Sequence, residues 1–129
     1  YLKKLGFIMG EGSYSNLGLH FTPNEDYSPC VIIGKNVSIG PGVTFLPNSE
    51  PNNSELLKNN SYVKNNLIKK NTQIIVEDDV WLGANCVLMP GITIKRGSII
   101  GAGAIVTKNT EEFCTYAGVP AKKIRNYIK

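Results

Sequence analysis

The chain has 129 residues and a mass of 14.1 kDa, which is enough for one domain (residues 1–129) and too little for two. Its hydrophobic content is 42% and its aromatic content only 9%, so we expect a core built mainly from Ile, Val and Leu, as in packed strands. The net charge is +4, and no run of Lys and Arg is typical of a nucleic-acid-binding surface. The single histidine, His20, excludes sites that need two or three histidine ligands, such as a zinc hydrolase centre.

The cysteines indicate a compartment. Cys30, Cys86 and Cys114 are widely spaced, odd in number and contain no CxxC pair. This argues against a disulfide framework and favours the reducing cytoplasm. No apolar run approaches the length of a membrane span, and the residues after Tyr1 lack the apolar stretch of a secretion signal. We therefore expect a cytoplasmic protein without a membrane span.

A six-residue period begins near the N-terminus. Leu17 and Phe21 fit one hexad with both side chains pointing inward, and residues 9–14 fit a poorer one. His20 lies between the two and is expected to point outward. Extra residues around 23–26 interrupt the phase. The period then resumes with Ile33, Ile39 and Phe45, each followed four residues later by a smaller member at Val37, Val43 and Ser49.

The stretch from about residue 46 to 73 departs from the period. It is rich in asparagine and includes three Asn-Asn pairs. A short helical turn is expected near residues 54–57. A loop of this length is uncommon in a compact domain unless it serves a function. We expect it to protrude as a functional arm.

The hexads return without interruption after the loop. Apolar residues lead each hexad, a second member follows four later, and Gly34, Gly40, Gly83 and Gly101 come directly after a leading residue. The leading residues are Val76, Leu82, Leu88, Ile94, Ile100 and Val106, and the second members are Val80, Cys86, Ile92, Ser98, Ala104 and Thr110.

A period of six is neither helical nor a simple strand alternation. It is typical of a coil with a triangular cross-section, in which each hexad forms one side and three sides make a coil of about 18 residues. Like residues then stack above like and form a continuous apolar core. The tail, residues 121–129, has Ile124 and Ile128 four residues apart, which predicts a short helix that caps the open end.

Several runs in the C-terminal half resemble one family. They are residues 80–85, residues 88–94, the Gly-Ala-Gly segment 101–103 with residues up to Lys108, and the Gly-Val-Pro-Ala-Lys segment 118–122. With the hexads, they resemble the hexapeptide-repeat acyltransferases, in the branch of the maltose, galactoside and nodulation O-acetyltransferases. The resemblance implies an all-β fold, a left-handed parallel β-helix. It also implies a homotrimer with its active sites between subunits.

The resemblance also implies a binding groove for acetyl-CoA as acyl donor, without a metal. Small residues let an extended ligand approach the backbone, and cations balance its phosphates. The residues that match the pantetheine wall are Trp81, Ala84, Ala102 and Thr107, and those that match the phosphate end are Lys108, Lys122 and Arg125.

The family base is a histidine in a Gly-His-Pro-like segment, and here Glu50 stands at that position, in Asn-Ser-Glu-Pro. Two residues are candidates for the base. Glu50 can accept a proton if a neighbouring subunit and the acyl group shield it from water. His20 can supply an imidazole, because its expected outward position faces the groove.

Asn16, in Tyr-Ser-Asn, and Gly18 match acceptor-binding positions of the family, with Gly18 expected on the same strand as His20. Asp78 and Asp79 are interpreted as a turn and not as metal ligands. The function predicted is acetyl-CoA-dependent O-acetylation of a hydroxyl on a sugar or surface polysaccharide precursor. Two alternatives remain open: N-acetylation of an amino sugar, and a catalytically silent protein that binds CoA or serves a structural role.

Overall fold

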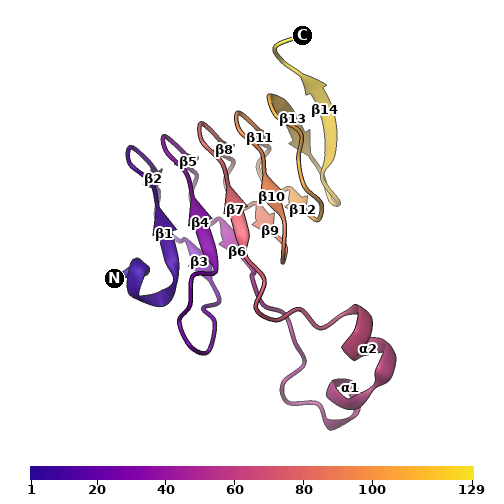
Figure 1. The fold of residues 1–129 in the computed structure, drawn as a ribbon. Coiled ribbons are helices and arrows are strands. Elements are labelled where there is room, and N and C mark those ends of the chain that lie inside the picture. The colour runs from indigo at the N-terminus through magenta and orange to yellow at the C-terminus, as the bar shows by residue number, and fades with distance from the viewer.

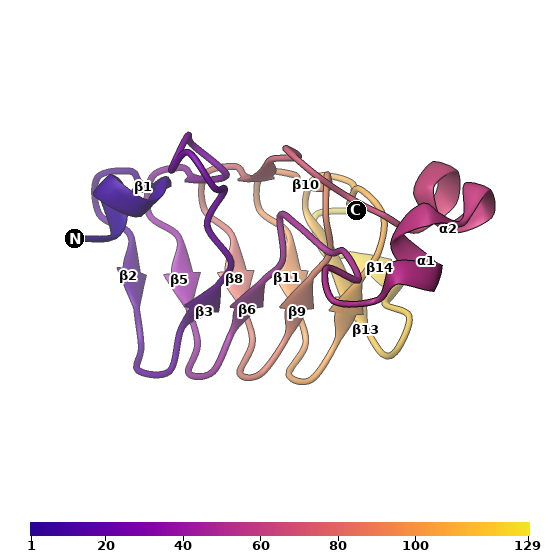
Figure 2. The same cartoon turned by 90° about the horizontal axis from the view of Figure 1, so that it is seen from below.

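The computed structural model describes residues 1–129 and consists of stacked coils, with the two chain ends at opposite ends of the stack (Figure 1). The first twelve strands along the chain belong to three sheets in rotation, so each sheet receives one strand from every coil, and the last two strands both join the second sheet. Within each sheet the strands are parallel, apart from the last one of the second sheet. Figure 2 shows how strands of successive coils lie beside one another. The short 3₁₀ helix Leu2–Leu5 precedes the first strand.

Sheet A contains β1 (Phe7–Met9), β4 (Val31–Ile33), β7 (Ile74–Val76) and β10 (Thr93–Ile94). Sheet B contains β2 (Tyr14–Ser15), β5 (Ser38–Ile39), β8 (Trp81–Leu82), β11 (Ile99–Ile100), β13 (Cys114–Ala117) and β14 (Lys122–Asn126). Sheet C contains β3 (His20–Phe21), β6 (Thr44–Phe45), β9 (Val87–Leu88) and β12 (Ile105–Val106).

The leading residues of the hexads form the core, as the period predicts. In sheet B, Ile39 pairs with Leu82, which in turn pairs with Ile100, and all three side chains are buried. The second members after the loop are buried as well, including Val80 and Cys86. Stacking like on like therefore produces one continuous cluster of aliphatic side chains along the coil axis.

Gly83 is required at its corner by the next coil and not by an unusual backbone dihedral. A Cβ atom on Gly83 would lie 2.6 Å from the Ile100 carbonyl oxygen and 2.7 Å from the Ala102 amide nitrogen. Other corner residues do need the left-handed region: Asn85 has φ 59° and stacks below Gly103 with φ 71°. Close approach and turn geometry thus place glycine and asparagine at different positions of the same corner.

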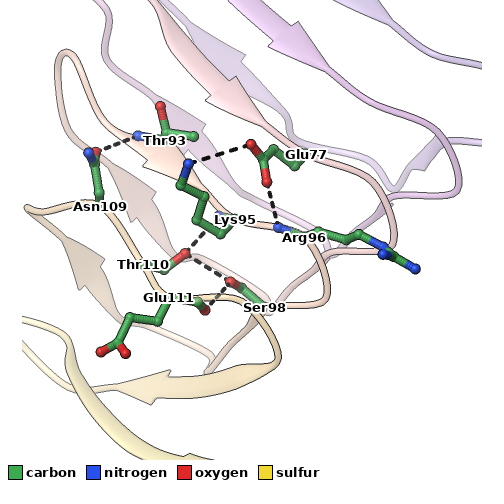
Figure 3. Close-up of polar contacts among 8 residues, drawn as sticks. All are labelled: Glu77, Thr93, Lys95, Arg96, Ser98, Asn109, Thr110 and Glu111. Carbon is green, nitrogen blue, oxygen red and sulfur yellow. Dashed lines mark hydrogen bonds and ion pairs between the residues drawn. The ribbon is translucent and has the colours of Figure 1, made fainter.

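Sheet A ends at β10, where side chains take over the role of a further strand (Figure 3). The amide of Thr93 donates to Asn109 Oδ1 and that of Lys95 donates to Thr110 Oγ1, both at 2.8 Å. The Thr110 hydroxyl also lies 2.8 Å from Ser98 Oγ, inside the coil. This accounts for two polar residues at positions that are apolar in the coil before: they satisfy each other and the sheet edge.

The expected C-terminal helix is wrong. Residues 122–126 form β14, which pairs antiparallel with β13. Ile124 and Ile128 are 63% and 62% exposed, so the four-residue spacing does not mark a buried face. A helix this short with no apolar face to bury is marginal in water, whereas a strand satisfies the free edge of β13.

Leu17 was expected to point inward, and this is also wrong, because its side chain is 90% exposed. The pairing places Ser15 beside the buried Ile39, and Phe21 beside the buried Phe45. The leading inward positions of the first coil are therefore Met9, Ser15 and Phe21, and Leu17 lies in the corner between the last two. Phe21 itself packs against the core, with its ring centroid 5.1 Å from that of Phe7.

The segment 46–73, here called the arm, projects away from the stacked coils (Figure 1). It contains α1 (Glu55–Asn59), capped by the Ser54 hydroxyl, and α2 (Ser61–Asn66), capped by the Asn60 side chain. Neither helix buries a residue within the chain. The turn expected near residues 54–57 is thus the start of α1, and α2 was not anticipated. None of the helices is long and apolar enough to cross a membrane.

Candidate functional site

The base of the arm is held by a compact set of hydrogen bonds. Ser49 and Lys69 exchange two backbone hydrogen bonds of 2.9 and 2.8 Å, so the outgoing and returning strands of the arm lie side by side. The Asn48 amide group donates to Asn24 Oδ1 at 2.9 Å, and its oxygen accepts the Asn71 N–H at 3.2 Å. These contacts join the arm to the loop between β3 and β4, and they fix the position of the residue that follows Ser49, Glu50.

Glu50 lies between two cavities. The polar cavity, of about 650 Å³, has no hydrophobic residue in its lining, which includes Glu25, Asp26, Asn48, Glu50, Lys70 and Asn71. The arm cavity, of about 430 Å³, lies against α1 and α2 and includes Glu50, Asn52, Lys58, Lys64, Ile68 and Lys70 in its lining. Both volumes fall in the range of small-molecule sites. Glu50, Asn52 and Lys70 belong to both cavities.

The Glu50 side chain is partly buried, with 22% of its surface exposed, and its Oε2 lies 3.2 Å from Lys70 Nζ. The sequence analysis did not single out Lys70. Its position follows from the Ser49–Lys69 pairing, which places the residue after each of these two on the same side of the base of the arm. The sequence indicates that the two ends of the arm must meet, but not which residues pair there.

His20 points outward from β3, as expected, and its side chain is exposed. It pairs across sheet C with Thr44 and belongs to the lining of neither cavity. Gly18 is not on the strand of His20, which corrects the expectation. It lies in the corner before β3 with φ 82°, and a Cβ atom there would be 3.3 Å from the Gly42 amide nitrogen. Asn16 lies in the same corner, exposed, with its backbone amide bonded to Ile39 O at 2.9 Å.

Two of the residues matched to the donor groove share a row on sheet B. The outward-facing Trp81 pairs with Ile99, Ile99 with Thr115, and Thr115 with Arg125 on β14. Trp81 is more than half exposed, and Arg125 is exposed. Three strand spacings separate the two, about 14 Å. Lys122 is also on β14, opposite Ala117.

Ala84 and Ala102 occupy equivalent corners of successive coils. The two corners are joined by the Gly103 N–H, which donates to the Ala84 carbonyl at 2.8 Å. The Ala84 N–H itself donates to no group of the chain. Thr107 and Lys108 follow β12 and are exposed, on the side of sheet C. The matched residues are therefore spread over the corner between sheets B and C, the outer face of sheet B and the segment beyond the far end of sheet C.

The thiols are buried in the coil interior and do not belong to the site. Burial raises the pKa of the Cys86 thiol to about 12 and also raises that of Cys30. A thiol is nucleophilic only as the thiolate, so these side chains are inert at neutral pH. Asp78 and Asp79 lie in a turn, where Asp79 has φ 57° and Asp78 accepts the Lys35 N–H at 2.8 Å. No three His, Cys, Asp or Glu side chains are grouped so that they could hold a metal ion.

Comparisons with known proteins agree with this architecture. Residues 73–108 match the bacterial transferase hexapeptide family (six repeats). The galactoside O-acetyltransferase of Escherichia coli (strain K12) is 38% identical over 117 residues, which is 91% of this chain. The chain belongs to the hexapeptide-repeat transferases. Their fold is a left-handed parallel β-helix, in accord with three sheets that receive strands in rotation.

Two further proteins illustrate the range of the similarity. A hexapeptide-repeat-containing acetyltransferase of Vibrio cholerae O1 biovar eltor, solved with acetyl-CoA, superposes with a TM-score of 0.75 at 26% identity, covering 94% of this chain and 60% of that one. A 2,3,4,5-tetrahydropyridine-2,6-dicarboxylate N-acetyltransferase of Staphylococcus aureus (strain JH9) is 35% identical over 71% of this chain and 31% of its own length. The chain spans 52% of the length of the Escherichia coli relative, so it corresponds to about half of that protein.

Proposed function

We propose that this chain transfers an acetyl group from acetyl-CoA to a hydroxyl of a sugar or surface polysaccharide precursor. The observation that carries the proposal is the position of Glu50. It stands where the resemblance places the family base, and its partly buried carboxylate lies between two cavities that can hold a small polar acceptor. The similarity to galactoside O-acetyltransferases supports acetyl-CoA as donor and a sugar as acceptor.

The reaction follows from these groups. The Glu50 carboxylate takes the proton of the acceptor hydroxyl as its oxygen attacks the thioester carbonyl carbon. The resulting oxyanion is stabilised by a backbone amide, for which the Ala84 N–H is free. Ala84 and Glu50 lie at opposite ends of sheet C, so in the proposed homotrimer the two groups would come from neighbouring copies. When the tetrahedral intermediate collapses, the carbon–sulfur bond breaks and the CoA sulfur receives the proton from Glu50. His20 is the alternative proton acceptor, and its absence from both cavities favours Glu50.

The donor would lie along the corner between sheets B and C. Ala84 and Ala102 leave the backbone accessible there, and Trp81 provides a flat apolar wall. Thr107 follows β12 at the other end of sheet C and would reach the donor from a neighbouring copy. Lys108, Lys122 and Arg125 supply cations for the phosphates. Asn16 and Gly18 lie at the same corner and line neither cavity of their own chain, so they would meet an acceptor only from a neighbouring copy. In a homotrimer a second copy would close this groove, and both arm helices, which bury nothing in their own chain, would gain a partner surface.

The test is a thiol-release assay with acetyl-CoA and a panel of sugars and amino sugars. We expect Glu50→Gln to lower kcat by about 100-fold or more, the size of a general-base contribution, while CoA affinity stays unchanged. Glu112→Gln, on an exposed carboxylate without an ion pair, is the matched control. If His20→Ala lowers kcat and Glu50→Gln does not, His20 is the base. If neither change lowers turnover, both assignments are wrong.

N-acetylation of an amino sugar is the second candidate. A neutral amine is already nucleophilic and needs a weaker base than a hydroxyl does, which fits the absence of the family histidine. The N-acetyltransferase among the similar proteins supports N-acetylation as a reaction of related chains. The amino sugars in the panel distinguish the two reactions. CoA binding without turnover on any acceptor would support the catalytically silent alternative.

A further inference from the structure

The charges around Glu50 are unevenly distributed between the two cavities. In the polar cavity, Glu25, Asp26 and Glu50 outnumber the one cation, Lys70. Hydrogen bonds from the Ser28 hydroxyl and from the Ser28 N–H lower the pKa of Asp26, so this carboxylate is charged at neutral pH. The lining of the arm cavity has the opposite balance. An anionic group is therefore repelled on one side of Glu50 and attracted on the other.

The arm cavity contains three ammonium groups and a single carboxylate in its lining. Lys58 pairs with Glu55 at 2.8 Å, and Lys70 pairs with Glu50 at 3.2 Å. Lys64 makes no ion pair in the chain. Its ammonium is thus the one whose charge is not already balanced, and Lys58 and Lys70 add donors on the same walls.

We propose that the arm cavity binds an anionic group of the acceptor, a phosphate or a carboxylate, through Lys64 with help from Lys58 and Lys70. This rests on the proposed function and names its substrate class: an acidic saccharide. The phosphate or carboxylate of the acceptor lies against the arm helices, and Ile68 contacts the apolar face of the sugar ring. The hydroxyl to be acetylated points toward Glu50. The remaining hydroxyls face the amide and hydroxyl groups of the polar cavity, such as Asn48 and Asn71.

The first test is binding, which does not depend on turnover. Glucose, glucose 6-phosphate and glucuronate are titrated calorimetrically into the CoA-saturated protein. Charge-assisted hydrogen bonds to partly exposed lysines predict about 10-fold tighter binding of both anionic sugars than of glucose. Their affinity falls as salt is raised, because the site is open to screening. A preference for only one anion assigns phosphate or carboxylate as the ligand group. Equal affinity for all three sugars overturns the inference.

Variants identify the cavity. Lys64→Gln should lower the affinity for the anionic sugars about 5–10-fold, the effect of losing one charge-assisted contact at an exposed site, and leave glucose unaffected. Lys69→Gln is the matched control, since it removes the same charge from the arm at a side chain outside both linings. If Lys64→Gln raises the KM for acetyl-CoA instead, the lysines hold the CoA phosphates and the inference is wrong. If neutral sugars alone turn over, the proposed function stands and this inference fails, whereas anionic sugars that bind without any turnover support the inference and refute the function.

Discussion

The buried thiol of Cys86 makes the stability of the fold depend on pH in the alkaline range. Its pKa rises from an ordinary 9.0 to about 12, because burial disfavours the thiolate. The folded chain therefore retains a proton that the unfolded chain releases above pH 9. The contribution to the free energy of unfolding is fully present below pH 9 and is lost between pH 9 and about pH 12. At pH 10.5 the loss amounts to about 2 kcal/mol, from 1.4 kcal/mol per pH unit.

Urea unfolding of the native chain and of Cys86→Ala, under reducing conditions at pH 8 and pH 10.5, measures this effect. At pH 8 we expect the variant to be less stable by about 1 kcal/mol, the cost of the small cavity. At pH 10.5 the difference should shift by about 2 kcal/mol in favour of the variant, which has no thiol to ionise. Val80→Ala, at the equivalent buried position one hexad earlier, should show a difference that does not change with pH. A pH-independent difference for Cys86→Ala would refute the reasoning.

Two further substitutions test the corners and the closed edge of sheet A. Gly83→Ala should destabilise the fold by about 1–3 kcal/mol, because its Cβ atom would overlap the backbone of the next coil. Gly101→Ala, whose Cβ atom would have its nearest neighbours at 3.4 Å, should stay within about 1 kcal/mol of the native chain, and equal melting temperatures for the two variants would contradict the close-approach argument. Thr110→Val should cost about 1–3 kcal/mol in chemical unfolding, since the Lys95 amide loses its acceptor and the Ser98 hydroxyl keeps only the Glu111 carbonyl as a partner. The exposed Thr107→Val is its control, and a stable Thr110→Val variant would mean that Asn109 closes the edge alone.

The regular part of the fold could be predicted because every hexad has the same surroundings, with its leading residue packed between two neighbouring coils. Leu82 and Leu88 lead successive sides of one coil, and both are buried by the coils above and below. The prediction failed at the ends of the stack, where one of these neighbours is missing. Leu17 in the first coil and Ile124 after the last one are apolar residues at suggestive spacings, and both are exposed. Their environment is set by neighbours that periodicity does not describe.

The candidate site divides in the same way. The position of Glu50 at the start of the arm followed from a motif, and the cavities beside it did not. Lys64 and Lys70 reach the vicinity of Glu50 only because the arm returns on itself through the Ser49–Lys69 pair. Such a contact joins residues about twenty positions apart in a segment without a period, so no sequence rule locates it.

The coil is also a unit of length. Val76 pairs with Ile94, 18 residues later, and each coil bonds only to its immediate neighbours, while the closing side chains Asn109 and Thr110 belong to the last coil alone. Adding or removing one whole coil would therefore leave both ends of the stack intact. The surface along which an extended ligand lies changes in steps of one strand spacing, about 4.8 Å, and not continuously. The number of coils thus sets the length of an extended ligand that such a chain can bind along its surface.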